Sequence, residues 1–163
     1  MSILKVNTIQ KKDGTAFPLG KIGQVGSAIN SSNYTGTNTS FTELSSSMRV
    51  TLTPASSSSY FICTFISKCR YTVSQQYTSY KLVYSTDSGS TWNDIANTEQ
   101  FTGFNNTQIQ DHHVPVCCQG YFTPNTTNQT IFSIYVKTNN NSWSLGTVAA
   151  TGQNSFIVQE VLA

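Results

Sequence analysis

Charged side chains are scarce in this sequence of 163 residues, and this scarcity argues against partners that are bound mainly through charge. Asp, Glu, Lys and Arg make up only 10% of the chain, and the formal net charge is +2. Four of the seven lysines lie within the first 21 residues, at Lys5, Lys11, Lys12 and Lys21. Nucleic-acid binding needs a much stronger basic surface, so we expect these lysines to be solvated and predict no nucleic-acid partner.

Long hydrophobic runs are also absent. No segment approaches the roughly 20 apolar residues that cross a bilayer. Residues 1–10 lack the apolar stretch of a secretion signal. We therefore expect a soluble protein that is synthesised in the cytoplasm, is not exported by a classical signal and does not insert into a membrane.

The acidic residues form no recognisable catalytic pair. A glycoside hydrolase needs two carboxylates that converge on one bond. The acidic residues of this chain are scattered, at Asp13, Glu43, Asp87, Asp94, Glu99, Asp111 and Glu160. We expect that the protein is not an enzyme and needs no cofactor.

Cysteine and histidine are few, and their spacing matches no known zinc module. Two disulfides are one possibility for Cys63, Cys69, Cys117 and Cys118. Cys63 and Cys69 share strand parity, and we expect free thiols in the core, as in a reducing cytoplasm. The best metal candidate is the group His112, His113, Cys117 and Cys118. Pro115 interrupts that segment, so we expect a structural role and no bound metal. A histidine site on a symmetry axis is the alternative.

What the sequence does contain is typical of β-structure. Ser, Thr, Asn and Gln occur throughout, and eight Tyr and nine Phe residues stand in short runs with β-branched residues. Turn-forming clusters separate these runs, which predicts short strands and almost no helix. The expected strands are residues 22–29, 41–44, 48–53, 60–70, 77–85, 107–118, 129–138, 143–148 and 156–162. The pattern favours an all-β, antiparallel jelly roll or β-sandwich.

Alternating apolar residues identify the expected core, and two strands carry apolar residues on their other face as well. The expected core residues are Val50, Leu52, Cys63, Phe65, Leu82, Tyr84, Phe132, Ile134, Val136, Phe156 and Val158. On the opposite parity, Ile62 and Ile66 share one face of their strand, and Ile157 and Val161 share one face of theirs. A second apolar face predicts a subunit interface. Cover by a loop of the same chain is the alternative.

Residues 1–20 differ from the rest and predict an extended N-terminal arm before a single domain over residues 21–163. Lys-Lys-Asp-Gly forms a polar turn in it, and Phe-Pro-Leu-Gly a rigid connector. Its apolar residues Ile3, Leu4, Val6, Ile9 and Phe17 are candidates for docking on a neighbouring protein. An additional strand on its own domain is the alternative.

Residues 85–92, Ser-Thr-Asp-Ser-Gly-Ser-Thr-Trp, form the most specific motif. The spacing places Asp87 to accept backbone hydrogen bonds from residues two further on, Gly89 to supply a positive φ, and Trp92 to cover the turn. The motif resembles the Asp-box of sialidase propellers. Those enzymes bind their substrate with three arginines, whereas this chain has two, and 163 residues cannot form the blades of a propeller. We interpret Ser85, Asp87, Gly89 and Trp92 as a structural turn.

Aromatic residues in polar segments are the candidates for ligand contact. They are Tyr34, Tyr71, Tyr77, Phe101 and Phe104. Aromatic rings stack on sugar rings, and amides and hydroxyls hydrogen-bond to sugar hydroxyls. These segments are therefore candidate surface-binding loops, and a host glycan or surface protein is the expected partner.

Four stretches of the chain together resemble small virion proteins of tailed bacteriophages, especially those of marine bacteria and cyanobacteria. They are the opening MSILKVNTIQ, the connector GTAFPLGKIGQV, the sequence VTLTPASSSS at residues 50–59, and the ending FIVQEVLA at residues 156–163. The similarity covers most of the chain.

The resemblance implies a jelly-roll domain that assembles as a homotrimer and contacts other virion proteins through its arm. It implies a non-enzymatic structural protein of the virion, a tail-fibre tip or receptor-binding appendage for host attachment. The sequence has no coiled-coil heptads and no repeats of a fibre shaft. A compact capsid decoration, or cement, protein bound to the capsid shell is therefore the alternative.

Overall fold

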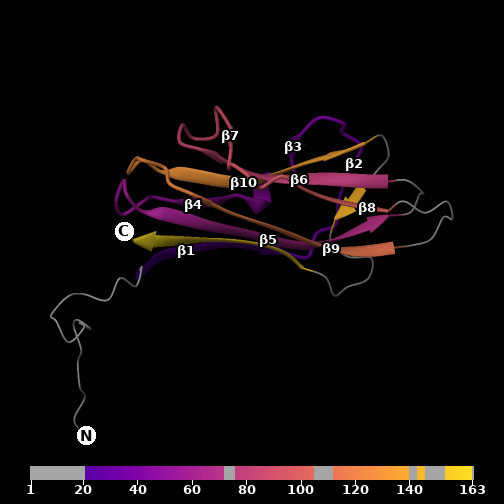
Figure 1. Ribbon diagram of the computed structural model, residues 1–163, viewed down its shortest axis with the longest axis horizontal. Helices are drawn as coiled ribbons and strands as arrows, with labels where there is room; N and C mark the ends of the chain where they lie inside the picture. The colour runs from indigo at the N-terminus through magenta and orange to yellow at the C-terminus, as the bar shows by residue number, and fades with distance from the viewer. Residues whose placement is uncertain (1–20, 72–75, 105–111, 140–142, 146–152, 163) are drawn as a thin grey trace, which may run out of the picture.

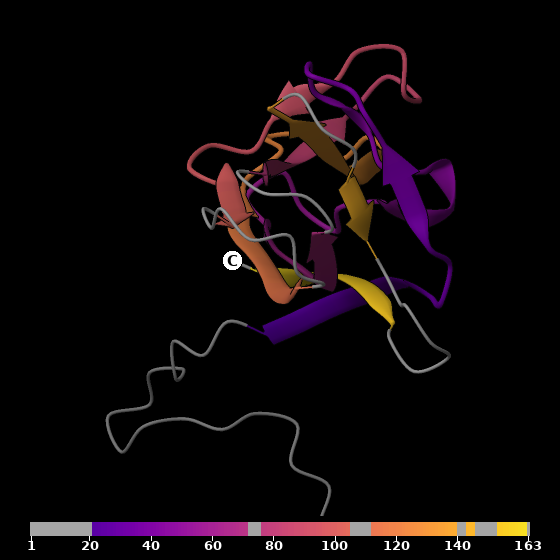
Figure 2. The same ribbon diagram turned by 90° about the vertical axis from the view of Figure 1, so that its right-hand side faces the viewer.

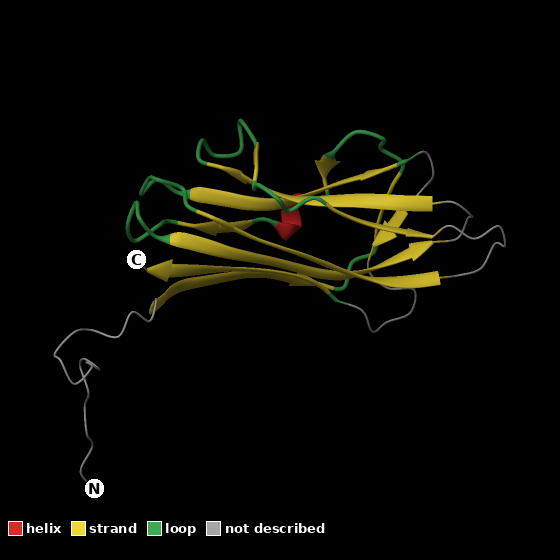
Figure 3. Ribbon diagram, in the orientation of Figure 1, coloured by secondary structure: helices red, strands yellow, loops and turns green. Residues whose placement is uncertain are grey.

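The computed structural model describes residues 21–71, 76–104, 112–139, 143–145 and 153–162 (Figure 1). Within these ranges, strands predominate, and one short 3-10 turn at Ser46–Met48 is the helical element (Figure 3). The strands are β1 (Lys21–Asn30), β2 (Tyr34–Gly36), β3 (Thr42–Glu43), β4 (Val50–Leu52), β5 (Tyr60–Tyr71), β6 (Gln76–Ser85), β7 (Asn93–Asp94), β8 (Gln100–Phe104), β9 (His112–Phe122), β10 (Thr130–Thr138), β11 (Trp143–Leu145) and β12 (Asn154–Leu162).

The strands form two antiparallel sheets packed face to face. In the first sheet the order is β1-β12-β5-β9, and β11 and β2 extend the β12 side of β5. In the second, β4 and β3 pair with one side of β10, β6 with the other, and β7 and β8 lie beyond β6. Figure 2 shows the sandwich turned by 90°, with β1 beside β12 at its lower edge. The orders β1-β12-β5-β9 and β4-β10-β6-β8 are those of a jelly roll, so the predicted fold class is confirmed.

Alternating residues of both sheets fill the space between them. Phe61, Cys63 and Phe65 of β5 face Phe132, Ile134 and Val136 of β10, and all six are fully buried. The rings of Phe61 and Phe132 lie 5.0 Å apart, and Tyr84 stacks on Phe122 at 3.8 Å. The core predicted from alternation is therefore the observed one, with half-buried Tyr84 at its margin.

Some strand boundaries differ from the prediction. β9 continues to Phe122, four residues past the expected end, because it pairs with β5 along its whole length. The short strands β2, β7 and β8 were not predicted. They are edge strands whose polar residues give little alternation, and pairing with β11 and β6 fixes them.

The segment between β7 and β8 closes one side of the sandwich. Ile95 and Thr98 are buried, and the Thr98 hydroxyl accepts a hydrogen bond from the Leu82 N–H at 3.1 Å and donates to the Ile95 carbonyl at 2.7 Å. Gly120 of β9 has no side chain because a Cβ there would collide with Thr98. This close approach lets the segment bridge β6 and β9.

Glu160 is a fully buried carboxylate at the corner where the chain passes from the second sheet to the first. Its Oε1 accepts a hydrogen bond from the Ala55 N–H at 2.7 Å, and its Oε2 accepts one from Gln24 at 3.1 Å. Gln24 also donates to the Thr53 carbonyl at 2.6 Å. The carboxylate therefore joins β12, β1 and the β4–β5 connection.

Replacing Glu160 with Ala should lower the free energy of unfolding by about 2–3 kcal/mol, because the Ala55 N–H and the Gln24 amide lose a charged acceptor. Glu160→Gln keeps one oxygen for Ala55, so its effect should be about half as large. Urea unfolding measures both values. A Glu160→Ala variant as stable as the native protein would contradict this role of the carboxylate.

Candidate functional site

The outer faces of the two sheets differ in character, and this difference defines the candidate functional surfaces. The outer face of β1, β12, β5 and β9 is called the apolar face. Its apolar side chains are Ile22, Val25, Ile29, Tyr60, Ile62, Ile66, Cys117, Tyr121, Ile157 and Val161. Val25, Ile29 and Ile66 are 50–56% exposed and Tyr121 is 77% exposed, so no described segment covers the centre of this face.

The polar residues of the apolar face are uncharged over most of its area. They are Ser27, Thr64, Gln119, Ser155 and Gln159, and Gln119 donates to the Thr64 hydroxyl at 3.1 Å. Lys68 and Arg70 lie toward one end of β5. Tyr60, Ile62 and Tyr121 line a shallow hollow of about 410 Å³ with Gln119 and Gly120. Such a surface can be buried without removing a charge from water.

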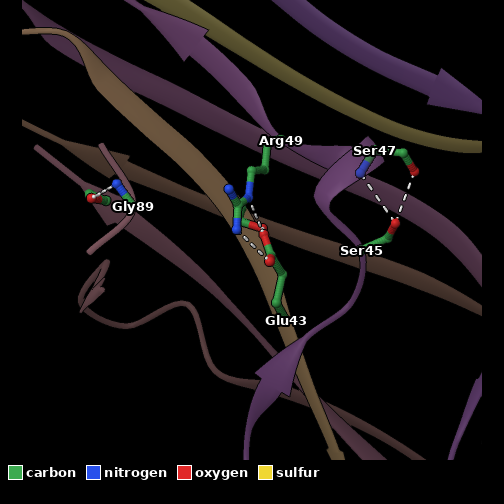
Figure 4. Close-up of polar contacts among 7 residues, drawn as sticks. Glu43, Ser45, Ser47, Arg49 and Gly89 are labelled. Atoms are coloured by element: carbon green, nitrogen blue, oxygen red, sulfur yellow. Dashed lines mark hydrogen bonds and ion pairs between the residues drawn. The ribbon is translucent and has the colours of Figure 1, made fainter. Parts of the chain in front are cut away.

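The outer face of the second sheet is covered by its own charged and aromatic residues. Arg49 donates two parallel hydrogen bonds to Glu43, at 2.6 and 2.7 Å (Figure 4). Ser133 donates to the same carboxylate at 2.7 Å. Burial acts to raise the pKa of Glu43, but the hydrogen bonds from Arg49 and Ser133 outweigh it and hold the pKa below its ordinary value.

The turn predicted as an Asp-box lies on this second face, after β6. Ser85 donates to Asp87 at 2.7 Å and accepts from the Gly89 N–H at 2.9 Å, and Gly89 has a φ of 87°. The expectation that Asp87 accepts from residues two further on is wrong. It accepts from the N–H of Thr91, four residues on, at 2.9 Å. Ser88 adopts a positive φ as well, 61°, which lengthens the turn.

Trp92 packs against the second sheet and the turn. Its ring lies 5.8 Å from the ring of Tyr135, and the Arg49 guanidinium lies 5.1 Å from its centroid. A Cβ on Gly89 would lie 3.6 Å from the Trp92 ring. The contacts of Trp92 therefore join the motif to the second sheet.

The five candidate contact aromatics occupy different environments. Tyr34 lies in β2 and is half-buried, and its hydroxyl binds Asn30 at 2.6 Å and Ser47 at 2.8 Å. Tyr71 and Phe104 end β5 and β8, and their side chains fall outside the described residues. Tyr77 and Phe101 are 50% and 76% exposed. They stand on paired strands, so Phe101 is in β8 and not in the predicted loop.

Tyr77 and Phe101 share one face of the β6–β8 pair. Tyr77 is opposite Gly103 and Phe101 is opposite Ser79, which makes the two rings diagonal neighbours. Along the same face, Lys81 and residues 94–99 line a hollow of about 540 Å³. Neither ring is part of that lining, and the two rings together with the neighbouring hollow are called the aromatic groove. The sequence pointed to the two rings but not to the hollow, which depends on the β7–β8 segment.

The remaining predicted residues contribute no site in the described part of the chain. The arm residues Ile3, Leu4, Val6, Ile9 and Phe17 lie outside the described residues. His113 and Cys117 point outward from β9, about 13 Å apart along the strand, which is too far to share a metal. Cys118 points inward and donates to the Thr98 carbonyl, and the His112 side chain is not described. Within the described ranges, no three His, Cys, Asp or Glu side chains converge as metal ligands.

Comparison with known proteins identifies no family. No family model and no curated protein sequence matches the chain. Solved structures of similar fold include the Eiger TNF from S. frugiperda, with 9% identity, a TM-score of 0.49, and coverage of 85% of this chain and 92% of that one. The VP2 protein of an infectious bursal disease virus subviral particle has 10% identity, a TM-score of 0.48, and coverage of 98% and 42%.

A CocE/NonD family hydrolase from Staphylococcus aureus, with 12% identity, is also similar over 90% of this chain and 38% of that chain, with a TM-score of 0.40. The chain thus spans about two fifths of the VP2 and hydrolase chains. Similarity at this level carries no argument about function. In the described part of the chain, no helix is long and apolar enough to cross a membrane.

Asp87 should stabilise the turn in a pH-dependent way. Hydrogen bonds from the side chain and backbone of Thr91 and from Ser85 lower the pKa of Asp87 to about 2. The pKa of Asp in an unfolded chain is about 3.9. The contribution of Asp87 to the stability of the folded protein is therefore complete above that pH and is lost as the pH falls through about 2. The melting temperature of Asp87→Ala should therefore be a few degrees below that of the native protein at pH 6, and the difference should close toward pH 2.

Trp92→Ala is the control for this experiment. It removes packing against Tyr135 and Arg49, so it should cost about 2 kcal/mol with little dependence on pH. Thermal unfolding by circular dichroism between pH 2 and pH 7 distinguishes the variants. A constant difference between Asp87→Ala and native protein across this range would contradict the assignment.

Proposed function

We propose that this protein is a non-enzymatic structural subunit of a bacteriophage virion. It forms a homotrimer through the apolar face, binds other virion proteins through residues 1–20, and acts as a tail-fibre or receptor-binding appendage in host attachment. The observation that supports this proposal most directly is the apolar face, which one copy of the chain leaves exposed to water.

The contact at Glu160 joins two of the sequence stretches that carry the phage resemblance, residues 50–59 and the ending at residues 156–163. Glu160, in the second stretch, accepts a hydrogen bond from the backbone N–H of Ala55, in the first.

Self-association is the most economical way to cover the apolar face. Exposed apolar side chains on β1, β5 and β9, interspersed with uncharged polar ones, make this face more apolar than is usual for the surface of a monomer. Its uncharged centre needs no complementary charge on a partner, so a second copy of the same face suits it. Closed cyclic symmetry limits the assembly, and the number three comes from the phage resemblance.

A capsid decoration protein is the second candidate. The absence of shaft repeats from the sequence favours a compact subunit, and a jelly roll that docks through an arm would serve on a capsid as well as on a tail. Quantitative mass spectrometry of purified particles separates the two functions. A tail appendage should be present as a few trimers, whereas a decoration protein should reach a copy number set by icosahedral symmetry.

Ile66→Lys should dissociate the trimer. Ile66 is 50% exposed in one copy, so a lysine fits the isolated domain but would place a charge in the apolar interface. Light scattering should give three times the 17.9 kDa chain mass for the native protein and a monomer for the variant. Thr51→Lys, at an exposed position on the second sheet, is the matched control and should remain trimeric. A native monomer at micromolar concentration would refute the interface.

Cys117 offers an independent measurement of the same interface. It is exposed on the apolar face opposite Ile66, whereas Cys63, Cys69 and Cys118 are buried. Burial raises the pKa of Cys63 and raises that of Cys118 to about 12, which keeps both thiols neutral and unreactive. At pH 8, a bulky maleimide should modify one thiol in the Ile66→Lys monomer and none rapidly in the native trimer. Equal labelling rates would contradict burial of this face.

A further inference from the structure

Among the described residues, the aromatic groove is the part of the second sheet's outer face where large aromatic rings are exposed to solvent. Phe101 is 76% exposed and Tyr77 is 50% exposed, whereas Trp92 and Tyr135 cover each other nearby. Gly103 lies directly opposite Tyr77 and has no side chain to cover that ring. Phe101 lies close to the hollow. It is two residues from Glu99, which lines the hollow, and two residues of extended chain span about 7 Å.

The charged side chains around the hollow form ion pairs of opposite charge. Lys81 binds Asp94 at 2.6 Å, and Lys137 binds Glu99 at 3.3 Å. Both ammonium groups lie over the Phe41 ring, at 4.4 and 4.2 Å from its centroid. The carboxylates of Asp94 and Glu99 are 62% and 56% exposed, so each keeps lone pairs that face solvent.

We propose that the aromatic groove binds a neutral oligosaccharide. The C–H face of a sugar ring stacks on Phe101 or Tyr77, and the sugar hydroxyls donate to the exposed carboxylates and bond to the Asn97 amide. Two cations paired with two carboxylates give no net attraction for an anionic polymer. The hollow of about 540 Å³ has the volume of an ordinary small-ligand pocket and accommodates one or two sugar rings.

This inference rests on the proposed role in host attachment and names the class of ligand for it. One groove has a small contact area and binds weakly, but three grooves on one trimer gain avidity on a polysaccharide surface. The groove and the apolar face lie on opposite sheets, so assembly leaves the groove open.

The test uses the full-length protein and an array of neutral oligosaccharides of glucose, galactose and mannose, together with sialylated and sulfated counterparts. The native protein should bind at least one neutral oligosaccharide. Phe101→Ala should weaken that binding at least tenfold, whereas Phe101→Trp, which keeps a ring for stacking, should retain it within threefold. Thr51→Ala, on the same sheet but away from the groove, is the matched control and should bind like the native protein.

Each outcome bears on the inference separately from the trimer. Circular dichroism and light scattering on every variant establish that the fold and oligomer are unchanged. Binding only to anionic members, no binding to any neutral member, or undiminished binding by Phe101→Ala would overturn the carbohydrate site while leaving a trimer intact. A monomeric protein that binds neutral sugars through Phe101 would keep the site and refute the trimer.

Discussion

The passage of the chain from one sheet to the other depends on a buried carboxylate. Glu160 on β12 accepts hydrogen bonds from Ala55 in the β4–β5 connection and from Gln24 on β1. That connection leads directly into β5, the central strand of the first sheet, which pairs with both β12 and β9. A shift at this corner would change the register of β5 by one residue and exchange its core residues for its outward isoleucines. The separation of a filled core from an apolar outer face thus begins at Glu160.

The few charges of the sequence are distributed unevenly between the two sheets, and this gives the molecule two different surfaces. Three ion pairs, Arg49–Glu43, Lys81–Asp94 and Lys137–Glu99, lie on or beside the second sheet. These pairs are partly exposed, so each contributes little to stability. They make the outer face of the second sheet polar, with its charges paired within the same chain. The first sheet keeps its central rows uncharged, which suits burial against identical copies.

Alternation in the sequence predicted the long strands and the core because burial imposes a period of two on them. Two strands can be predicted from alternation alone, before their pairing is known. They are β5, with Phe61, Cys63 and Phe65, and β10, with Phe132 and Ile134. The Asp-box turn was predictable for a local reason, since the hydrogen bonds of Ser85 and Asp87 lie within residues 85–92. The sequence around Phe101 predicts a loop, because β8 is an edge strand whose conformation depends on pairing with β6 and not on local alternation. The hollow beside it could not be predicted from the sequence, because Lys81 of β6 and residues 94–99 line it together only after β7 and β8 have paired with β6.

Cyclic symmetry adds a constraint on how the apolar face can be used. A cyclic trimer repeats every residue around the axis, so residues close to the axis meet their own copies. Lys68 stands toward one end of β5, and three copies of its charge near the axis would repel. Val25, Ile62 and Ile66 carry no charge and can meet their copies without an electrostatic cost. In the proposed trimer, the axis would therefore lie over the uncharged residues of β1, β12 and β5, with Lys68 toward the rim.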